Sequence, residues 1–246
     1  MRVLVVDVGG TNVKFLATGQ RTPGKFPSGR TLTPQRMIAL VKEKTADWNY
    51  DVVSLGYPGL VRRGRIAAEP RNLGKGWVGF NFFRAFRCPV KVMNDAAMQA
   101  LGSYNGGRLL FLGLGTGLGS TLVVDGNVIA MELAHFPYKR GTLEDYLGLR
   151  GLKRLGKKKW QRQVAGAVAQ LIDALFPDDV VLGGGNAKKL KTLPPGSRAG
   201  NNALAFLGGY RMWQKGYHVE ADFAPGPRLV STRRSEKAEA RQLRRA

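Results

Sequence analysis

Asn94 and Asp95, an amide and a carboxylate, follow a short apolar run. Residues 89–93 have the composition of a buried strand, and residues 96–104 have helical spacing. In open α/β folds, ligands bind at the carboxyl ends of strands, where this pair is expected to lie. A carboxylate there can take a proton from a substrate hydroxyl, and the amide can hold a second hydroxyl. The alternative is an Asn-Asp cap of the helix, and this stretch alone favours the cap.

Two strand–turn–strand units each carry a threonine flanked by glycine or asparagine. A Gly-rich turn between two strands forms a hairpin, unlike the strand–helix unit of a dinucleotide site. Its backbone N–H groups and hydroxyl can cradle phosphate, so two such units indicate a duplicated fold with phosphates between the halves. Two ordinary hairpins, the first with a buried aspartate, are the alternative. The candidate residues are Asp7, Gly9, Gly10, Thr11, Asn12 and Lys14 in the first unit, and Thr116 and Gly117 in the second.

Three further sets of residues are candidates for binding. Glu132 and His135, three residues apart after a strand, are able to hold sugar hydroxyls or a metal, although a single histidine is more often structural. The loop 70–79 contains Asn72 and is suited either to a polar pocket or to anchoring a core tryptophan. A triple glycine, Gly183, Gly184 and Gly185, follows a strand at an expected helix start, where backbone can lie against a phosphate or a flat ring.

The composition describes a globular and strongly basic chain. Its 246 residues are 43% hydrophobic and carry a net charge of +22. Residues 228–246 hold seven cations and two acids, which leaves +17 on the rest, so the folded part itself should attract polyanions. The single Cys88 excludes an internal disulfide and a cysteine-based zinc cluster. No apolar run is long enough for a membrane span and no signal peptide is recognisable, which favours a cytoplasmic protein.

The hydrophobic pattern predicts alternating strands and helices. Strands are expected at 3–8, 13–18, 52–55, 90–93, 109–114, 121–124, 128–131 and 180–182, and a hairpin at 60–67. Helices are expected at 33–47, 80–86, 96–104, 163–175 and 203–213, with the last capped by residues 200–202. Residues 141–159 should be basic and irregularly helical, and residues 233–246 a frayed or disordered helix.

Five stretches in this order resemble the motifs of ROK-family sugar kinases. They are DVGGTN at 7–12, NDA at 94–96, LGTGLG at 114–119, ELAH at 132–135 and GGG at 183–185. Two more stretches, NLGKGWVG at 72–79 and LPPG at 193–196 with Asn201 and Asn202, resemble the polyphosphate or ATP glucokinase branch of the family. The resemblance covers about residues 1–215.

The resemblance implies a duplicated α/β fold like that of actin, Hsp70 and hexokinase, which is ribonuclease H-like. Two α/β domains would enclose an interdomain active-site cleft. The first would comprise residues 1–94, completed by a helix near 201–215, and the second residues 95–200, followed by a basic tail at 226–246.

The resemblance also implies roles for the candidate residues. Asp95 would be the general base that takes the proton of the sugar 6-hydroxyl, and phosphoryl transfer would need Mg²⁺, contacted indirectly by Asp7, but no zinc site. Glucose or a related hexose and polyphosphate or ATP would be the partners, without a specific nucleic acid or a membrane, and a homodimer stays open. The hexose ligands would be Asn94, Glu132, His135 and Asn72. The phosphate cradle would include Gly9, Gly10, Thr11, Asn12, Lys14, Thr116 and Gly117, with Gly183, Gly184 and Gly185 on the nucleotide or distal-phosphate side.

The sequence departs from the family pattern on the sugar side. Ala134 stands where the family has glycine, and if that position required a positive φ, the alanine would cost roughly 1 kcal/mol or more. An alternative function is therefore a catalytically weakened ROK-like binding protein, acting as a sugar sensor or a polyanion binder. The basic charge instead favours polyphosphate as donor, because a long anion needs a track of cations outside the cleft. Candidate track residues are Arg62, Arg63, Lys75, Lys153, Arg154, Lys157, Lys158 and Lys159.

Overall fold

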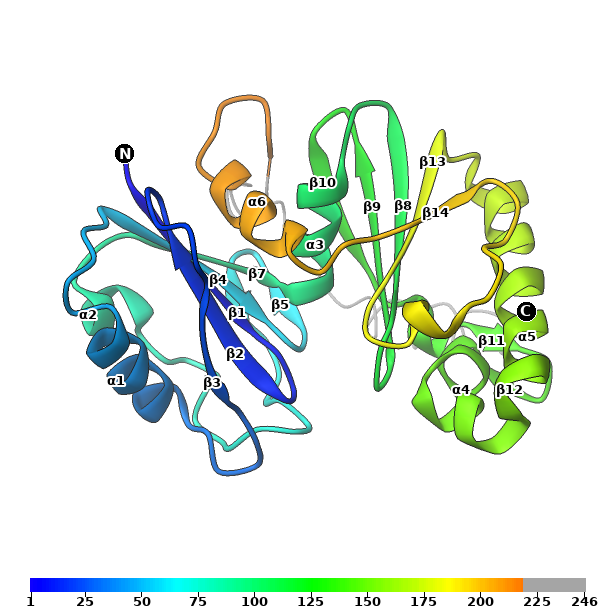
Figure 1. The fold of residues 1–246 in the computed structure, drawn as a ribbon, viewed down its shortest axis with the longest axis horizontal. Helices are drawn as coiled ribbons and strands as arrows, with labels where there is room; N and C mark the ends of the chain where they lie inside the picture. Colours follow the sequence, from blue (N-terminus) through cyan, green and yellow to red (C-terminus); the bar gives the residue numbers. More distant parts are fainter. Residues whose placement is uncertain (219–246) are drawn as a thin grey trace, which may run out of the picture.

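Two five-stranded sheets with the same strand arrangement form the framework of the protein (Figure 1). The computed structural model describes residues 1–218. In the first sheet the order is β3-β2-β1-β4-β7, with β1 (Val3–Val8), β2 (Asn12–Ala17), β3 (Gly24–Pro27), β4 (Val52–Tyr57) and β7 (Val90–Asn94). In the second the order is β10-β9-β8-β13-β14, with β8 (Arg108–Leu114), β9 (Leu118–Val124), β10 (Asn127–Met131), β13 (Asp179–Gly183) and β14 (Ser197–Ala199).

Each sheet begins as an antiparallel meander of three strands and continues with two parallel strands. In the first sheet, β1 pairs antiparallel with β2 and parallel with β4, and in the second, β8 pairs antiparallel with β9 and parallel with β13. The duplicated arrangement expected from the two Gly-Thr units is therefore present. Two short hairpins, β5 (Val61–Arg62) with β6 (Arg65–Ile66) and β11 (Pro137–Tyr138) with β12 (Gly141–Thr142), complete the strands.

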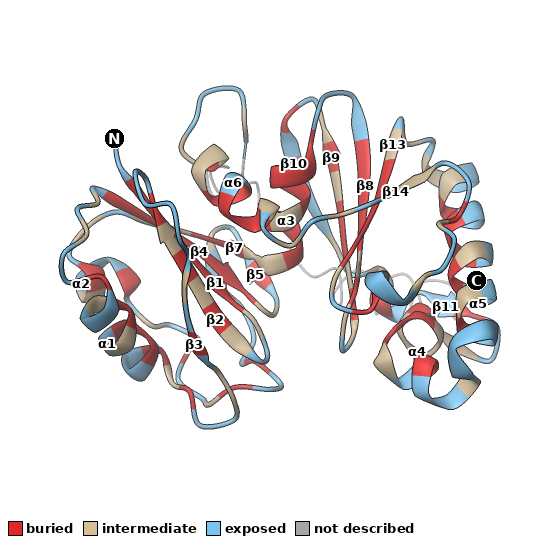
Figure 2. Ribbon diagram, viewed as in Figure 1, coloured by how far each residue is buried: buried red, intermediate tan, exposed pale blue. Residues whose placement is uncertain are grey.

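Helices cover both faces of each sheet, so the central strands are buried on both sides (Figure 2). In β1, Leu4 and Val6 belong to one core cluster, whereas Val3 and Val5 belong to another. This explains why these strands are continuously apolar rather than alternating. The helices are α1 (Pro34–Lys44), α2 (Phe82–Phe86), α3 (Asp95–Ser103), α4 (Leu143–Leu147), α5 (Leu149–Leu175) and α6 (Leu204–Arg211), with single 3₁₀ turns η1 (Leu133–His135) and η2 (Ala187–Lys189).

α3 and α6 lie between the two sheets, whereas α1 and α2 cover the outer face of the first sheet and α4 and α5 that of the second (Figure 1). The two central helices approach closely because glycines face each other. A Cβ on Gly102 would collide with the carbonyl of Leu204, and one on Gly208 with the carbonyl of Met98. Through this close packing, α3 and α6 connect the two halves of the chain.

Three predicted elements differ from the structure. The helix expected at 163–175 is the second part of α5, which is interrupted at Gly156 by a backbone conformation (φ 71°, ψ 160°) that a residue with a Cβ rarely adopts. The triple glycine leads into the 3₁₀ turn η2 rather than an α-helix. The last helix, α6, is shorter than the expected 203–213, but Asn201 does cap the turn before it, because its Oδ1 accepts a hydrogen bond from the Ala203 N–H (3.0 Å). The predicted basic tail, 226–246, lies outside the described residues. No helix within residues 1–218 is both long and apolar enough to cross a bilayer.

Candidate active site

Asn94 and Asp95 stand where β7 passes directly into α3. The Asn94 Oδ1 accepts hydrogen bonds from the backbone N–H groups of Ala96 (2.9 Å) and Ala97 (3.2 Å), and its Nδ2 donates to the Gly59 carbonyl (3.0 Å). Asn94 is therefore the N-cap, and Asp95 occupies the first position of the helix. Asn94 alone makes the helix cap that was the alternative to a functional role for the pair. The Asp95 carboxylate therefore remains at the end of the strand.

The half-buried Asp95 is coupled electrostatically to the buried carboxylate of Asp7. Burial, followed by the negative charge of Asp7, raises the Asp95 pKa to about 7, against the opposing effect of the Ala96 and Asp95 backbone N–H groups. Burial likewise raises the Asp7 pKa to about 6, although Lys14 opposes it. Near neutral pH a carboxyl with such a pKa is able both to accept and to release a proton, which suits a general base.

The sheet register explains why these two acids are neighbours. Asp7 pairs with Gly56 on β4, and Gly56 in turn pairs with Met93 on β7, two residues before Asp95. A Cβ on Gly56 would lie 3.5 Å from Asp7 Oδ1 and would collide with the Met98 side chain. The glycine between the strands thus leaves room for both the carboxylate and the packing of α3.

The first predicted phosphate turn, Gly9 to Asn12, is closed by its own backbone. The Gly9 N–H donates to the Asn12 carbonyl (3.0 Å), and the Ser28 hydroxyl donates to the Gly9 carbonyl (2.7 Å). Gly10 and Thr11 are exposed at the tip, and Lys14 follows on β2 opposite Asp7. Asn72 lies against this turn, because a Cβ on Gly10 would be 4.0 Å from its side chain. The structure therefore brings Asn72 to the turn with the phosphate candidates.

The second turn, Gly115 to Gly117, is a meeting point of three segments. The Leu149 N–H at the start of α5 donates to the carbonyls of Gly115 (3.1 Å) and Thr116 (3.2 Å). The Asn186 Nδ2, which belongs to the segment after β13, donates to the Gly115 carbonyl (2.8 Å).

The triple glycine reaches this turn through that segment. Gly184 has a φ of 81° and lies against the Leu114 backbone, so a side chain would not fit there. Gly183 ends β13, and a Cβ on Gly185 would meet open space. The structure thus brings the triple glycine beside Gly113 and Leu114, the residues that lead into the second turn.

Glu144 is a residue of this region that the sequence interpretation missed. Its Oε2 accepts from the Leu118 N–H (3.2 Å) and lies against Gly117, and its Oε1 is 3.9 Å from Arg71 Nη1. This ion pair joins the loop after β6 to α4, and so links the two halves of the chain. Glu144 stands in the first turn of a helix with a Thr142–Asp145 capping box, where an acid is expected for stability alone, so the sequence gives no separate signal.

Glu132 directly precedes the single turn η1 and His135 is its last residue, and both residues are exposed. The position of this turn is fixed by Ser120, whose hydroxyl donates to Met131 (2.8 Å) and accepts from the Leu133 N–H (3.1 Å). The neighbouring Gly119 packs against Ala96 at the start of α3, because a Cβ there would be 2.6 Å from the Ala96 Cβ. A short run of contacts therefore connects Glu132 and His135 with the base of the Asp95 helix.

Ala134, which stands where the resembled family has glycine, adopts an ordinary backbone conformation. Ala134 is buried within η1 and is not among the residues with positive φ, which are Arg63, Arg87, Asp125, Lys139 and Phe176 besides glycines. The replacement of glycine by alanine therefore imposes no left-handed backbone strain at this position.

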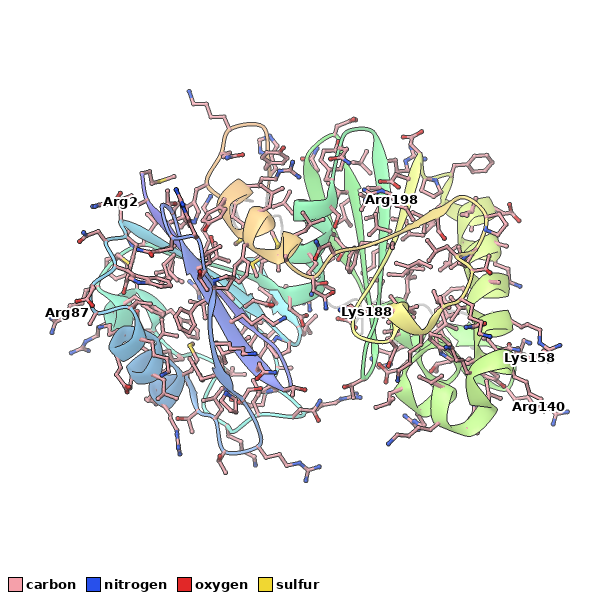
Figure 3. All side chains as sticks on the ribbon, in the orientation of Figure 1. Arg2, Arg87, Arg140, Lys158, Lys188 and Arg198 are labelled. Carbon is pink, nitrogen blue, oxygen red and sulfur yellow. The ribbon has the colours of Figure 1, made fainter. Side chains whose placement is uncertain are left out.

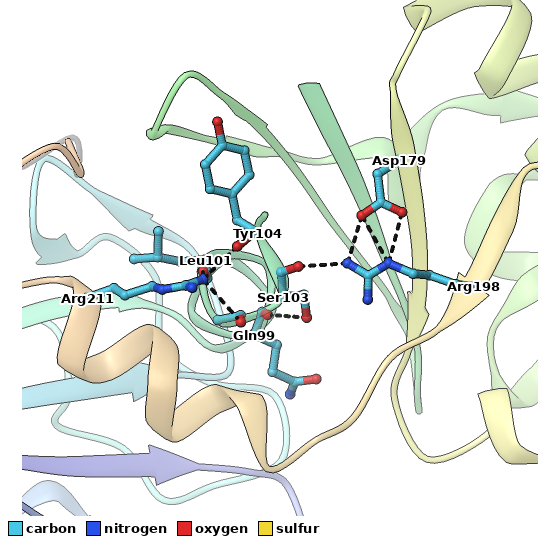
Figure 4. A network of polar contacts seen from close by, with 8 residues as sticks. Gln99, Leu101, Ser103, Tyr104, Asp179, Arg198 and Arg211 are labelled. Atoms are coloured by element: carbon cyan, nitrogen blue, oxygen red, sulfur yellow. Dashed lines mark hydrogen bonds and ion pairs between the residues drawn. The ribbon is translucent and has the colours of Figure 1, made fainter. Parts of the chain in front are cut away.

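Two arginines hold the carboxyl end of α3 (Figure 4). Arg198 forms hydrogen bonds with both Asp179 oxygens (2.7–3.0 Å) and donates to the Ser103 carbonyl (2.7 Å). Arg211 donates to the carbonyls of Leu101 (2.7 Å) and Tyr104 (2.8 Å). Because the last carbonyls of a helix lack intrahelical partners, these contacts fix the helix that begins at Asp95.

The described residues of this region offer single carboxylates, rather than a cluster, as candidate metal ligands. No group of three or more His, Cys, Asp or Glu side chains suited to a metal ion occurs among residues 1–218. Asp7 is 7% exposed, and the positive charge of Lys14 acts on its carboxylate. A buried carboxylate of this kind fits a hard cation bound through water.

Comparisons with known proteins agree with this arrangement, although no protein-family model matches the chain. Polyphosphate glucokinase of Mycobacterium tuberculosis is 28% identical over 214 residues, covering 75% of this chain and 77% of the relative. The polyphosphate/ATP-glucomannokinase of Arthrobacter sp. strain KM superposes with a TM-score of 0.71 at 20% identity, covering 84% of this chain and 96% of that one. The ROK-family glucokinase of Streptomyces griseus gives 0.67 at 16% identity, covering 85% and 97%.

These similarities confirm the resemblance to ROK-family sugar kinases and the actin/hexokinase-like α/β fold that it implies. In sequence, the chain is similar to polyphosphate glucokinases and is glucokinase-like.

Proposed function

We propose that the chain is a sugar kinase that transfers a phosphoryl group from polyphosphate, ATP or both to the 6-hydroxyl of glucose or a related hexose. Similarity to polyphosphate glucokinases supports phosphoryl transfer to a sugar. The observation that carries the proposal is Asp95, a carboxylate at a strand end whose pKa is about 7. That pKa places its proton exchange in the neutral range, where a general base is most effective.

In the proposed reaction, Asp95 accepts the proton of the sugar 6-hydroxyl as that oxygen attacks the terminal phosphorus. The new O–P bond forms while the bridging P–O bond breaks, and the shortened donor leaves with the electron pair. The protein contributes mainly position and charge, as is usual in phosphoryl transfer. Glu132 and His135, with Asn94 and Asn72, are proposed to hold the sugar hydroxyls. Mg²⁺, with Asp7 as its indirect protein contact, would neutralise charge on the donor phosphates.

The phosphates are proposed to lie between the two Gly-Thr turns. Exposed backbone N–H groups and threonine hydroxyls are available at the tips of both turns, and Lys14 adds a positive charge beside Asp7. The proposed donor residues are Gly9, Gly10, Thr11, Asn12, Lys14, Thr116 and Gly117, with Gly183, Gly184 and Gly185 on the distal side.

We propose further that residues 1–94 with α6 form one domain and residues 95–200 the other. The Ser54 hydroxyl donates to the Gly209 carbonyl (2.6 Å) and the Lys91 ammonium to the Met212 carbonyl (2.9 Å), so the C-terminal helix is bonded to the first sheet. Closure of two such domains on a sugar would exclude water from the reaction.

The alternative, a catalytically weakened ROK-like binding protein, is not favoured. Its main support was the altered loop after Glu132, and Ala134 in that loop has an ordinary backbone conformation. The relatives found by sequence are named as kinases.

The test is the substitution Asp95→Asn, with Asp47→Asn as the control on an exposed turn. Glucose phosphorylation is measured with polyphosphate and with ATP by detection of glucose 6-phosphate. Loss of the base should lower kcat by about 10²–10⁴-fold, whereas the control should be unchanged. Unchanged activity would remove Asp95 from the mechanism. A wild-type protein without activity on any tested hexose would favour the binding protein.

A further inference from the structure

We infer that the first part of α5 and the segment after β13 form a binding track for long-chain inorganic polyphosphate, outside the site of phosphoryl transfer. This inference rests on the proposed function and assigns it a second, separately testable binding surface. The basic track is defined as Arg150, Lys153, Arg154, Lys157, Lys158, Lys159 and Arg162 of α5, with Lys188, Lys189 and Lys191 beside them.

The basic track is exposed and nearly free of opposing charge. All ten side chains belong to exposed residues, and residues 149–162 contain no Asp or Glu. Among the described residues, Arg150 is the only member of the track with an ion pair, to Asp145 at 3.4 Å. Arg154 instead donates to the Asp145 carbonyl and lies over the Tyr146 ring. The other cations are thus available to an anionic ligand.

The basic track starts at the second phosphate turn. The N–H of Leu149, the residue before Arg150, donates to the carbonyls of Gly115 and Thr116, and Asn186 donates to the same Gly115 carbonyl. Both basic segments therefore begin at the turn that is proposed to hold the donor. This contact favours the α5 residues of the predicted track over Arg62, Arg63 and Lys75, which belong to the first half of the chain.

The two basic segments also remain together beyond this turn. The Gln161 Nε2 donates to the Lys189 carbonyl (2.7 Å), so η2 lies against the middle of α5. Figure 3 shows Lys188 on η2 and Lys158 on the outer side of α5. The interruption at Gly156 divides residues 149–162 into two helical parts, each about 10 Å long at 1.5 Å per residue, and η2 lies beside the second part.

The side chains of the track suit a polyanion that has no bases. Proteins that bind single-stranded nucleic acid combine cations with exposed aromatic side chains on which bases stack. The aromatic residue of α5, Trp160, is fully buried, and its indole N–H donates to the Leu147 carbonyl. Phosphate groups alone can be recognised by the lysines and arginines, so inorganic polyphosphate fits this surface better than nucleic acid.

The test compares two triple variants that remove equal charge. Lys153→Gln/Lys157→Gln/Lys158→Gln alters the track, and Arg36→Gln/Lys44→Gln/Arg84→Gln alters exposed positions on α1 and α2. Binding of long-chain polyphosphate and of tripolyphosphate is measured by calorimetry at one fixed ionic strength. The KM of each donor in glucose phosphorylation is measured in parallel. Circular dichroism verifies that both variants are folded.

The track variant should bind long-chain polyphosphate about 3- to 100-fold more weakly. This range is the loss in affinity expected when the free energies of three exposed ion pairs are removed together. The KM of the track variant for long-chain polyphosphate should rise in parallel. Its affinity and KM for tripolyphosphate should stay unchanged, and the control variant should match the wild type for both donors. Equal losses in both variants would show a general field effect and overturn the inference. Unchanged binding of long-chain polyphosphate by the track variant would also overturn the inference. The same holds if single-stranded DNA binds through these lysines as tightly as polyphosphate does. If no donor supports phosphorylation, the proposed function fails, and the calorimetric comparison still decides the track.

Discussion

Asp95→Asn should stabilise the protein at alkaline pH while it removes activity. The pKa of Asp95 is raised from 3.8 to about 7 by burial and by Asp7. Because the folded state holds its proton more tightly than the unfolded chain does, stability falls as pH rises through this window. Each pKa unit corresponds to about 1.4 kcal/mol, so ionised Asp95 costs the native state about 4 kcal/mol above pH 7.

Asparagine cannot ionise, and it keeps a side-chain oxygen for the Ala96 N–H that now donates to Asp95 Oδ1 (2.8 Å). We therefore expect the variant to gain about 2–4 kcal/mol at pH 8, with the lower value allowing for solvent screening and imperfect geometry. At pH 5 much of the penalty is absent, because folded Asp95 is protonated, and the gain should fall to about 1–2 kcal/mol.

Urea denaturation of both proteins from pH 5 to 8, without donor and with a chelator, measures this difference. Asp47→Asn serves as the control, since Asp47 is an exposed carboxylate. A variant whose stability relative to wild type is independent of pH would refute the assignment of a strongly raised pKa to Asp95. A variant less stable than wild type at pH 8 would show that the ionised Asp95 carboxylate stabilises the native state.

Three further outcomes are expected. The value of kcat/KM should fall about tenfold per pH unit below pH 7, as Asp95 becomes protonated, and a profile flat from pH 5 to 8 would contradict its role. Gly102→Ala should destabilise the protein by about 1–3 kcal/mol in urea, because α3 and α6 touch there, whereas Gly185→Ala, facing open space, should cost much less. Arg198→Gln should lower the free energy of unfolding by about 1–3 kcal/mol, because the partly exposed Asp179 carboxylate loses its hydrogen-bonded partner, and an unchanged Tm would contradict this.

The elements next to the proposed site were predictable because local sequence determines them. Continuous apolar runs define strands buried on both faces, and the Asn-Asp pair defines a strand end and a helix start within one residue. The glycine turns were visible for the same reason. These features depend on backbone conformation and burial, which are expressed in neighbouring residues.

Features that depend on distant residues were not predictable in this way. The raised pKa of Asp95 arises partly from Asp7, eighty-eight positions earlier. The sheet register that brings the two residues together cannot be predicted from the residues around either one. Glu144 resembles an ordinary first-turn acid until Arg71 and the Leu118 N–H are placed beside it. The interruption of α5 at Gly156 was also not predicted, because a single exposed glycine in a basic helix does not by itself indicate a break.

The late position of α6 in the chain has a consequence for biosynthesis. The inner face of β1 and β4 is covered by a helix at residues 204–211, so the first sheet, although translated early, stays incomplete until nearly the whole described chain has been made. Domains usually fold as units from the N-terminus during synthesis, and exposed apolar surface on a nascent chain invites aggregation. Val3, Val5 and Val52 therefore lack the α6 part of their apolar cover until residues 204–211 have been translated.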